Sequence, residues 1–219
     1  VIAIPWNDAA ALERAINENP GQIAGFISTP YHHPIFQDNE LPSEGYWRKV
    51  EQLLRKNGIV FIIDDVRCGF RLDLRGSNEH YGFKPDLICF CKAIANGYPI
   101  SALVGKDALK NTTAKVFQTG SYWYGAGCMA AAIACLKELK RVDAPAVVRQ
   151  KGTKLLNGLV QVAKNHGYNL KVTGEPCMPY LRITDDETLM FHQDLCGECT
   201  RRGAFFTSHH NWFITTAHT

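Results

Sequence analysis

A short apolar run that ends in two carboxylates constrains the fold more than any other stretch of this sequence. Residues 59 to 63 read IVFII, and Asp64 and Asp65 follow directly. A run that is apolar at every position is typical of a strand in a parallel sheet that helices cover on both faces. Two further runs, LICFC at 87–91 and ISALVG at 100–105, have a similar character. We therefore expect buried strands of one sheet.

Helical patterns alternate with these runs, and the alternation predicts an α/β fold with a mainly parallel sheet. Beyond Pro145 the pattern changes to a long helix at 146–166, followed by short strand-like pieces and a helix at 190–203. The sequence therefore predicts that residues 1–144 belong to one α/β domain and that residues 145–219 form a smaller α+β domain. Its strands are expected at 169–174, 179–184, 203–207 and 212–217.

Composition excludes several classes of function. A net charge of +3, scattered along the chain, gives no basis for a nucleic-acid surface. No apolar segment has the length of a membrane span, and the first residues lack a signal-peptide pattern, so we expect a cytoplasmic protein. The eight cysteines are therefore expected to be free thiols. Cys196 and Cys199 have the spacing of a redox or zinc motif, but no second motif supports it, and we predict no metal site.

Two ionisable residues follow neighbouring apolar runs. Asp64 ends the run at 59–63, and Lys92 directly follows the run at 87–91. Ligands of open parallel sheets bind at the carboxyl ends of the strands, so both side chains are expected at one rim. Burial beside the apolar run would favour the neutral, nucleophilic amine of Lys92. Such a pair suits pyridoxal phosphate, which needs an imine-forming lysine and an acid beside its ring nitrogen. The alternative is a structural ion pair, or strand ends that simply meet water.

The region from Phe61 to Gly105 resembles the cofactor region of the class III, fold-type I, pyridoxal-phosphate aminotransferases. It is most similar to the branch that includes glutamate-1-semialdehyde 2,1-aminomutase. The matching motifs are Asp64-Asp65-Val66, Gly69-Phe70-Arg71, Gly82-Phe83-Lys84-Pro85-Asp86-Leu87, Lys92, Gly97-Tyr98-Pro99 and Gly105. The resemblance implies the α/β large domain of these transferases, followed by a small α+β domain. It covers only about the second half of the family pattern, so the large domain is expected to be incomplete.

The resemblance also implies roles for single residues. Lys92 would form the Schiff base with pyridoxal 5′-phosphate and carry the proton in catalysis. Asp64 would pair with the ring nitrogen, and Val66 would pack against the ring. Ser121 would reach the cofactor phosphate in the neighbouring subunit of a homodimer. Asp65 stands where the family has glutamate, and its partner is not predicted.

The function implied is transfer of an amino group between a small-molecule amino donor and a carbonyl acceptor. Two alternatives stay open at this point. The first is an intramolecular 2,1-aminomutase of the glutamate-1-semialdehyde type. The second is a non-catalytic, truncated relative that serves as a dimerisation module. A redox or zinc protein that uses Cys196 and Cys199 is a third and more distant hypothesis.

Overall fold

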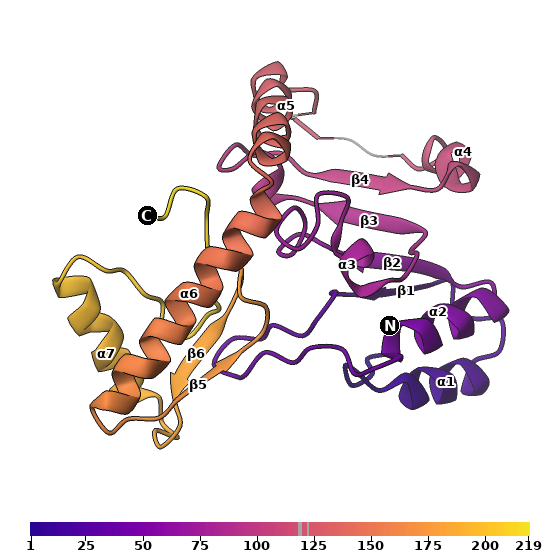
Figure 1. Ribbon diagram of the computed structural model, residues 1–219. Coiled ribbons are helices and arrows are strands. Elements are labelled where there is room, and N and C mark those ends of the chain that lie inside the picture. Colours follow the sequence, from indigo (N-terminus) through magenta and orange to yellow (C-terminus); the bar gives the residue numbers. More distant parts are fainter. Residues whose placement is uncertain (118–119, 122) are drawn as a thin grey trace. The chain divides into compact units, whose positions relative to one another are not determined.

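The computed structural model describes residues 1–117, 120–121 and 123–219, which form two compact units (Figure 1). The first unit comprises Val1–Pro30 and Pro42–Val142. The second comprises Tyr31–Leu41 and Asp143–Thr219. Each is described below by itself. None of the helices in the described ranges is long and apolar enough for a membrane span.

The first unit contains a four-stranded sheet in the order β1-β2-β3-β4. Strands β1, β2 and β3 run parallel, and β4 runs antiparallel to β3. The predicted α/β fold with a mainly parallel sheet is therefore confirmed. The strands are β1 (Gly25–Ser28), β2 (Val60–Asp64), β3 (Leu87–Phe90) and β4 (Ala102–Gly105).

Strand β4 is expected to be covered on both faces like the other strands, but it is antiparallel and partly exposed. The connection from Phe90 to Ala102 contains only the short 3-10 helix η1 (Lys92–Ile94). A parallel return needs a crossover of a dozen or more residues, usually with a helix, so this short connection brings the chain back antiparallel. In the sheet β4 pairs with β3 alone, and Leu103 and Val104 are 52% and 44% exposed.

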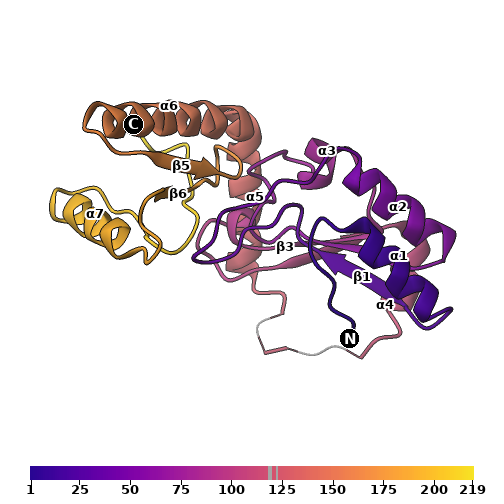
Figure 2. The ribbon, with the colours of Figure 1, turned by 90° about the horizontal axis from the view of Figure 1, so that it is seen from below.

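One hydrophobic core of the first unit lies between two helices and one face of the sheet, and a second is formed by Phe70, Phe90, Ile94, Ala95 and Ala132. Because alternate residues of a strand point to opposite faces, Phe61 and Ile63 of β2 are buried while Val60, Ile62 and Asp64 are only partly buried. Helices α1 and α2 pack side by side and cover the buried face (Figure 2). The helices of this unit are α1 (Ala9–Glu18), α2 (Tyr46–Lys56), α3 (Ser77–Tyr81), η2 (Asp107–Leu109), α4 (Lys110–Thr113) and α5 (Ala126–Arg141).

The second unit is built on helix α6 (Ala144–Asn165), the antiparallel strands β5 (Leu170–Thr173) and β6 (Tyr180–Ile183), and helix α7 (Met190–Arg201). The expected strands at 203–207 and 212–217 are wrong, because no strand forms there. In the second of these segments, the amides of Trp212 and Ile214 donate to the carbonyls of Pro179 and Cys177. These two hydrogen bonds join the segment to residues just before β6, and they do not continue into a β-ladder along that strand.

The segment Tyr31–Leu41 joins the second unit through polar contacts. The Tyr31 hydroxyl donates to the carbonyl of Met178 at 3.2 Å. The Asp38 carboxylate accepts two hydrogen bonds from Arg182, at 2.8 and 3.1 Å, and pairs with the Lys171 ammonium at 2.7 Å. A bidentate arginine pair fixes geometry as well as charge, so Asp38 fastens the segment to both strands of the β5–β6 pair.

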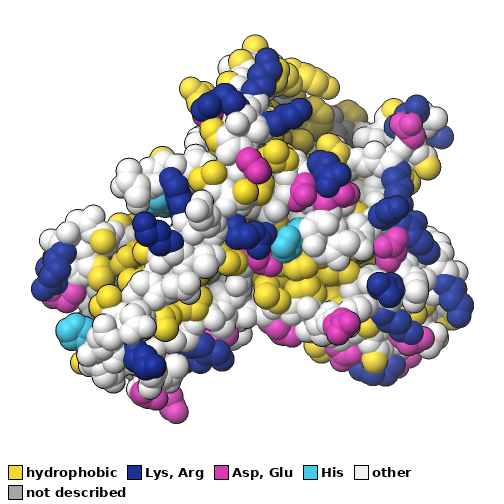
Figure 3. Space-filling view, in the orientation of Figure 1, with side chains coloured by type: hydrophobic (Ala, Val, Ile, Leu, Met, Phe, Trp, Pro, Cys, Tyr) yellow, Lys and Arg dark blue, Asp and Glu magenta, His cyan; other side chains and the backbone are white. Residues whose placement is uncertain are grey.

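Charged side chains of both signs lie on the face of the molecule in Figure 3. On the face in Figure 3, lysine and arginine side chains alternate with aspartate and glutamate side chains. This mixture agrees with the small net charge of +3.

Two glycines of α6 make a matched pair for a test of packing. A Cβ atom on Gly152 would collide with the carbonyl of Pro176, whereas Gly158 has nothing within 4 Å of that position. We expect Gly152→Ala to lower the free energy of unfolding by about 1–3 kcal/mol, because the helix must move away from Pro176. Gly158→Ala should raise it by roughly 0.5–1 kcal/mol, since alanine favours the helix.

Urea unfolding of the full protein and of both variants measures these changes. The same response at Gly152 and Gly158 would contradict the close approach of α6 to Pro176.

Candidate active site

Asp64 and Lys92 lie at the same edge of the sheet. Asp64 is the last residue of β2 and lies opposite Cys89 in the register with β3. Lys92 comes three residues after Cys89, as the first residue of η1. Because β2 and β3 are parallel, their carboxyl ends meet at one rim. The fold therefore brings a carboxylate and a primary amine to the same end of two neighbouring strands.

Val66 contacts Asp64 directly. The backbone N–H of Val66 donates to Oδ1 of Asp64 at 3.1 Å. This bond orients the carboxylate and leaves its Oδ2 atom for another partner. The first residue after the strand-end doublet thus shares a hydrogen bond with the acid expected to bind a cofactor.

The backbone of Lys92 adopts a conformation that is uncommon for a residue with a side chain. Its φ angle is 49°, and Asn96 and Gly97 follow with φ angles of 46° and 112°. Left-handed backbone at a non-glycine residue costs of order 1–3 kcal/mol, and such residues cluster at functional sites. The carbonyl of Lys92 accepts from the amides of Ala95 and Asn96, which holds this sharp turn in place.

The Lys92 side chain is exposed. The expectation that its amine is partly desolvated is therefore not met within this chain. The reason is local: Phe90 at the end of β3 is buried, but the turn of η1 carries the lysine beyond the strand end. Any desolvation of the amine must come from groups outside the described residues.

Of the two neighbouring acids, Asp65 is the buried one and Asp64 is not. Asp65 is 1% exposed, whereas Asp64 is only partly buried. Both oxygens of Asp65 accept hydrogen bonds from Ser77, from the backbone N–H at 2.8 Å and from the hydroxyl at 2.5 Å. Successive residues of a strand point to opposite faces, so the two acids of the doublet face different surroundings.

Burial raises the pKa of Asp65 to about 6. The two hydrogen bonds from Ser77 act against this rise, and the nearby charge of Asp64 adds to it. A carboxyl group whose pKa is raised by folding binds its proton more tightly in the folded state. Its contribution to stability is complete at a pH below the unfolded value of 3.8 and is lost as the pH rises through about 6.

We therefore expect a pH-dependent difference between the full protein and its Asp65→Asn variant. Between pH 8 and pH 5 the free energy of unfolding of the unsubstituted protein should gain about 1 kcal/mol relative to the variant, because asparagine does not titrate. Urea unfolding of both proteins at several pH values measures this. A difference that stays constant, or that grows as the pH rises, would show that Asp65 is not a buried acid with a raised pKa.

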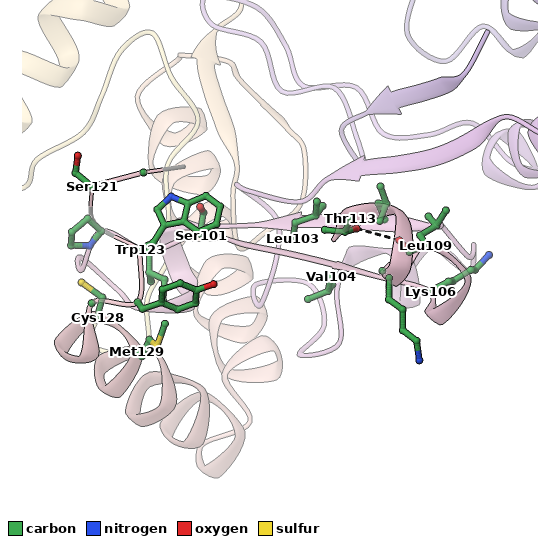
Figure 4. A pocket seen from close by; sticks show the side chains of 18 of the residues that line it. Ser101, Leu103, Val104, Lys106, Leu109, Thr113, Ser121, Trp123, Cys128 and Met129 are labelled. Carbon is green, nitrogen blue, oxygen red and sulfur yellow. Dashed lines mark hydrogen bonds between the residues drawn. The ribbon is translucent and has the colours of Figure 1, made fainter. Parts of the chain in front are cut away.

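Ser121 lies among the residues that precede α5. It lines a cavity of about 790 Å³ formed by β4, α4, the start of α5 and the residues that precede α5. Figure 4 shows Ser121 beside Trp123, at the opposite end of the cavity from Leu109. Asp64, Val66 and Lys92 are not among the residues that line it. The structure thus brings three of the four predicted site residues to one sheet edge, and the fourth to this cavity.

One cysteine, Cys89, lies opposite Asp64 at the strand ends, and burial and the Asp64 charge raise the pKa of its thiol. All eight are free thiols, as predicted. Burial raises the pKa of the Cys196 thiol to about 11, so the unreactive thiol form predominates at neutral pH. Within the described ranges, no group of three His, Cys, Asp or Glu side chains could hold a metal ion.

The Asp64 carboxylate and the Lys92 amine at the sheet edge suit a particular kind of ligand. A carboxylate with one oxygen left for another partner suits a protonated ring nitrogen, and a primary amine suits an aldehyde. Pyridoxal phosphate carries both groups, so Asp64 and Lys92 fit its ring. Among the four predicted site residues, only Ser121 offers a hydroxyl for its phosphate.

Comparison with known proteins identifies the family of this chain. Residues 8–218 match the family model for class-III aminotransferases. The aminopentol aminotransferase of Sphingopyxis macrogoltabida is 35% identical over 98% of this chain and 51% of its own length. A glutamate-1-semialdehyde 2,1-aminomutase of Opitutus terrae is 33% identical over 94% of this chain and 48% of its own.

A solved structure extends the match to three dimensions. It is described as the PLP internal aldimine form of the FumI protein of Sphingopyxis sp. MTA144, and it superimposes with a TM-score of 0.96 at 35% identity. The match covers 100% of this chain and 53% of that protein. The chain thus spans about half the length of the relatives it matches. Its sequence and its fold both place it among the class-III aminotransferases.

Proposed function

We propose that the full protein is a pyridoxal-phosphate-dependent aminotransferase and that this chain supplies its lysine and its ring-nitrogen acid. The single observation that carries the proposal is the placement of Asp64 and Lys92 at the carboxyl ends of the parallel strands β2 and β3. Membership of the class-III family supports the same reaction. The substrates are then a small-molecule amino donor and a carbonyl acceptor.

When bound, pyridoxal phosphate would supply an electron sink for the substrate carbon that bears the amine. Asp64 would hold a proton on the ring nitrogen, which keeps that sink effective. Lys92 would attach the cofactor through Nζ and, once the substrate amine has displaced it, would carry a proton from the substrate carbon to the cofactor's C4′ carbon. The strained turn at Lys92 would hold Nζ ready for both tasks.

Val66 and Ser121 would complete the contacts made by this chain. Val66 follows Asp64 directly and would pack against the ring. Ser121 lines the cavity beside β4, whose lining does not include Asp64, and this supports a role in a second copy of the site. We therefore propose a homodimer in which each Ser121 hydroxyl donates to the cofactor phosphate of the other subunit.

The aminomutase remains the second candidate, because one of the matching relatives is a glutamate-1-semialdehyde 2,1-aminomutase. An aminotransferase moves nitrogen between two molecules, whereas a mutase moves it within one. A non-catalytic dimerisation module would do neither.

Transfer of a ¹⁵N label separates these functions. The full protein with added pyridoxal phosphate is incubated with a panel of ¹⁵N-labelled amines and unlabelled carbonyl acceptors, and products are analysed by mass spectrometry. We expect label on the acceptor. Label that moves only to the adjacent carbon of its own donor would favour the mutase. A protein that binds the cofactor in no stable form and moves no label would contradict the proposal.

A further inference from the structure

A closed loop connects the end of β2 to the start of α3. Residues 66–76 leave the strand after Asp65 and return at Ser77, where both side-chain oxygens of Asp65 accept hydrogen bonds. Ser77 is fully buried and Asp65 nearly so, at 0% and 1% exposure. Hydrogen bonds to an ionised group are stronger than those between neutral groups, so this pair fixes the two ends of the loop.

The backbone of Asp65 ties the same point to the sheet and to the loop. Its N–H donates to the carbonyl of Cys89 at 3.0 Å, which continues the pairing of β2 with β3. Its carbonyl accepts from the N–H of Gly69 at 2.8 Å, which closes the first turn of the loop. Asp65 therefore contacts β3, the loop and α3 at once.

Two glycines show how closely the loop packs against this residue. A Cβ atom on Gly69 would lie 2.7 Å from the carbonyl oxygen of Asp65 and 2.7 Å from the ring of Phe90. Gly76 has a φ angle of 113°, and a Cβ there would lie 2.6 Å from the side-chain oxygen of Asn78. Both approaches need glycine, so the loop has little freedom to adopt another path.

The loop in turn orients Asp64. The N–H of Val66, the first residue of the loop, donates to Oδ1 of Asp64. If the Asp65–Ser77 bonds were lost, the backbone bonds of Asp65 would remain, but the far end of the loop would be released and the Val66 N–H would be held less firmly. The direction of the Asp64 carboxylate thus depends on a neighbour that points to the opposite face.

We propose that Asp65 is a positioning residue that holds Asp64 in line with the ring nitrogen of the cofactor by closing the 66–76 loop onto Ser77. The inference rests on the proposed function, since it concerns the same site. Asp65 itself is buried and would act through Asp64.

The test compares three variants of the full protein with added pyridoxal phosphate. Asp65→Ala removes both acceptors, and Asp65→Asn keeps one acceptor for the backbone N–H of Ser77. Asp73→Ala is the control, because it removes an acid of the same loop whose carboxylate accepts from the N–H of Arg75. Two quantities are measured: the dissociation constant for pyridoxal phosphate, and the pH at which the absorbance of the bound cofactor changes.

We expect Asp65→Ala to weaken cofactor binding by roughly tenfold or more and to shift the pH of the absorbance change by about one unit, since the ring nitrogen loses a well-placed anion. Asp65→Asn should stay close to the unsubstituted protein in both the dissociation constant and the pH of the absorbance change. Asp73→Ala should change neither of them. A purely structural role would lower the stability of the cofactor-free protein and leave the spectrum of the bound cofactor unchanged. That result overturns the inference.

A fourth variant, Ser77→Ala, covers the case in which Asp65→Ala does not fold. Ser77→Ala removes only the hydroxyl donor, and it should shift the absorbance in the same direction as Asp65→Ala, though less. An unshifted Ser77→Ala variant also overturns the inference. If the unsubstituted protein itself binds no cofactor, the proposed function fails instead, and the two failures are thereby distinguished.

Discussion

Lys92→Ala is expected to lower the rate of amine transfer by at least about a thousandfold, because one side chain supplies both the attachment point and the proton carrier. The backbone turn at residue 92 does not require a lysine, so the fold should be retained. Steady-state assays with the full protein and saturating pyridoxal phosphate measure the loss.

Lys84→Ala is the matched control for this change. Lys84 is an exposed lysine that precedes β3, whereas Lys92 follows it. The control should keep nearly full activity. An active Lys92→Ala variant, or an equal loss in both variants, would contradict the role of Lys92.

Asp64→Asn should lower the rate by roughly a hundredfold or more, because it removes the anion beside the ring nitrogen and leaves a neutral group of the same shape. Asp64→Glu keeps the charge, although its longer side chain loses the bond to Val66 N–H, and it should retain more activity than Asp64→Asn. The assay is the one used for Lys92. Wild-type rates in Asp64→Asn would show that the carboxylate does not serve the cofactor.

Much of the first unit could be predicted because local pattern and tertiary structure agree there. The apolar run at 59–63 becomes β2, and Asp64 ends it. The run at 87–91 becomes β3, and Lys92 follows it. Since parallel strands share one carboxyl edge, the placement of these two residues at that edge follows from the two strands alone.

Other features could not be read from local pattern, because they depend on contacts between distant segments. The direction of β4 depends on the length of its connection to β3 and not on its composition. The segment Tyr31–Leu41 belongs to the second unit through Asp38, whose partners Lys171 and Arg182 are far away in sequence.

The Asp64-Asp65 doublet shows both the strength and the limit of sequence reasoning. Its position at a strand end predicts a site, but it does not show which acid is buried. The alternation of a strand requires the two side chains to face opposite ways, and that signal was present in the sequence. The partner of Asp65, Ser77, lies beyond an entire loop and only the structure reveals it.

The central claim is that Lys92 holds pyridoxal phosphate, and borohydride reduction followed by peptide mass analysis tests it most directly. The full protein is loaded with the cofactor, reduced and digested, and the modified lysine is located by fragmentation. The account predicts a stable pyridoxyl adduct on the peptide that contains Lys92. An adduct on another lysine only, or a fully loaded protein that carries no adduct at all, would contradict it.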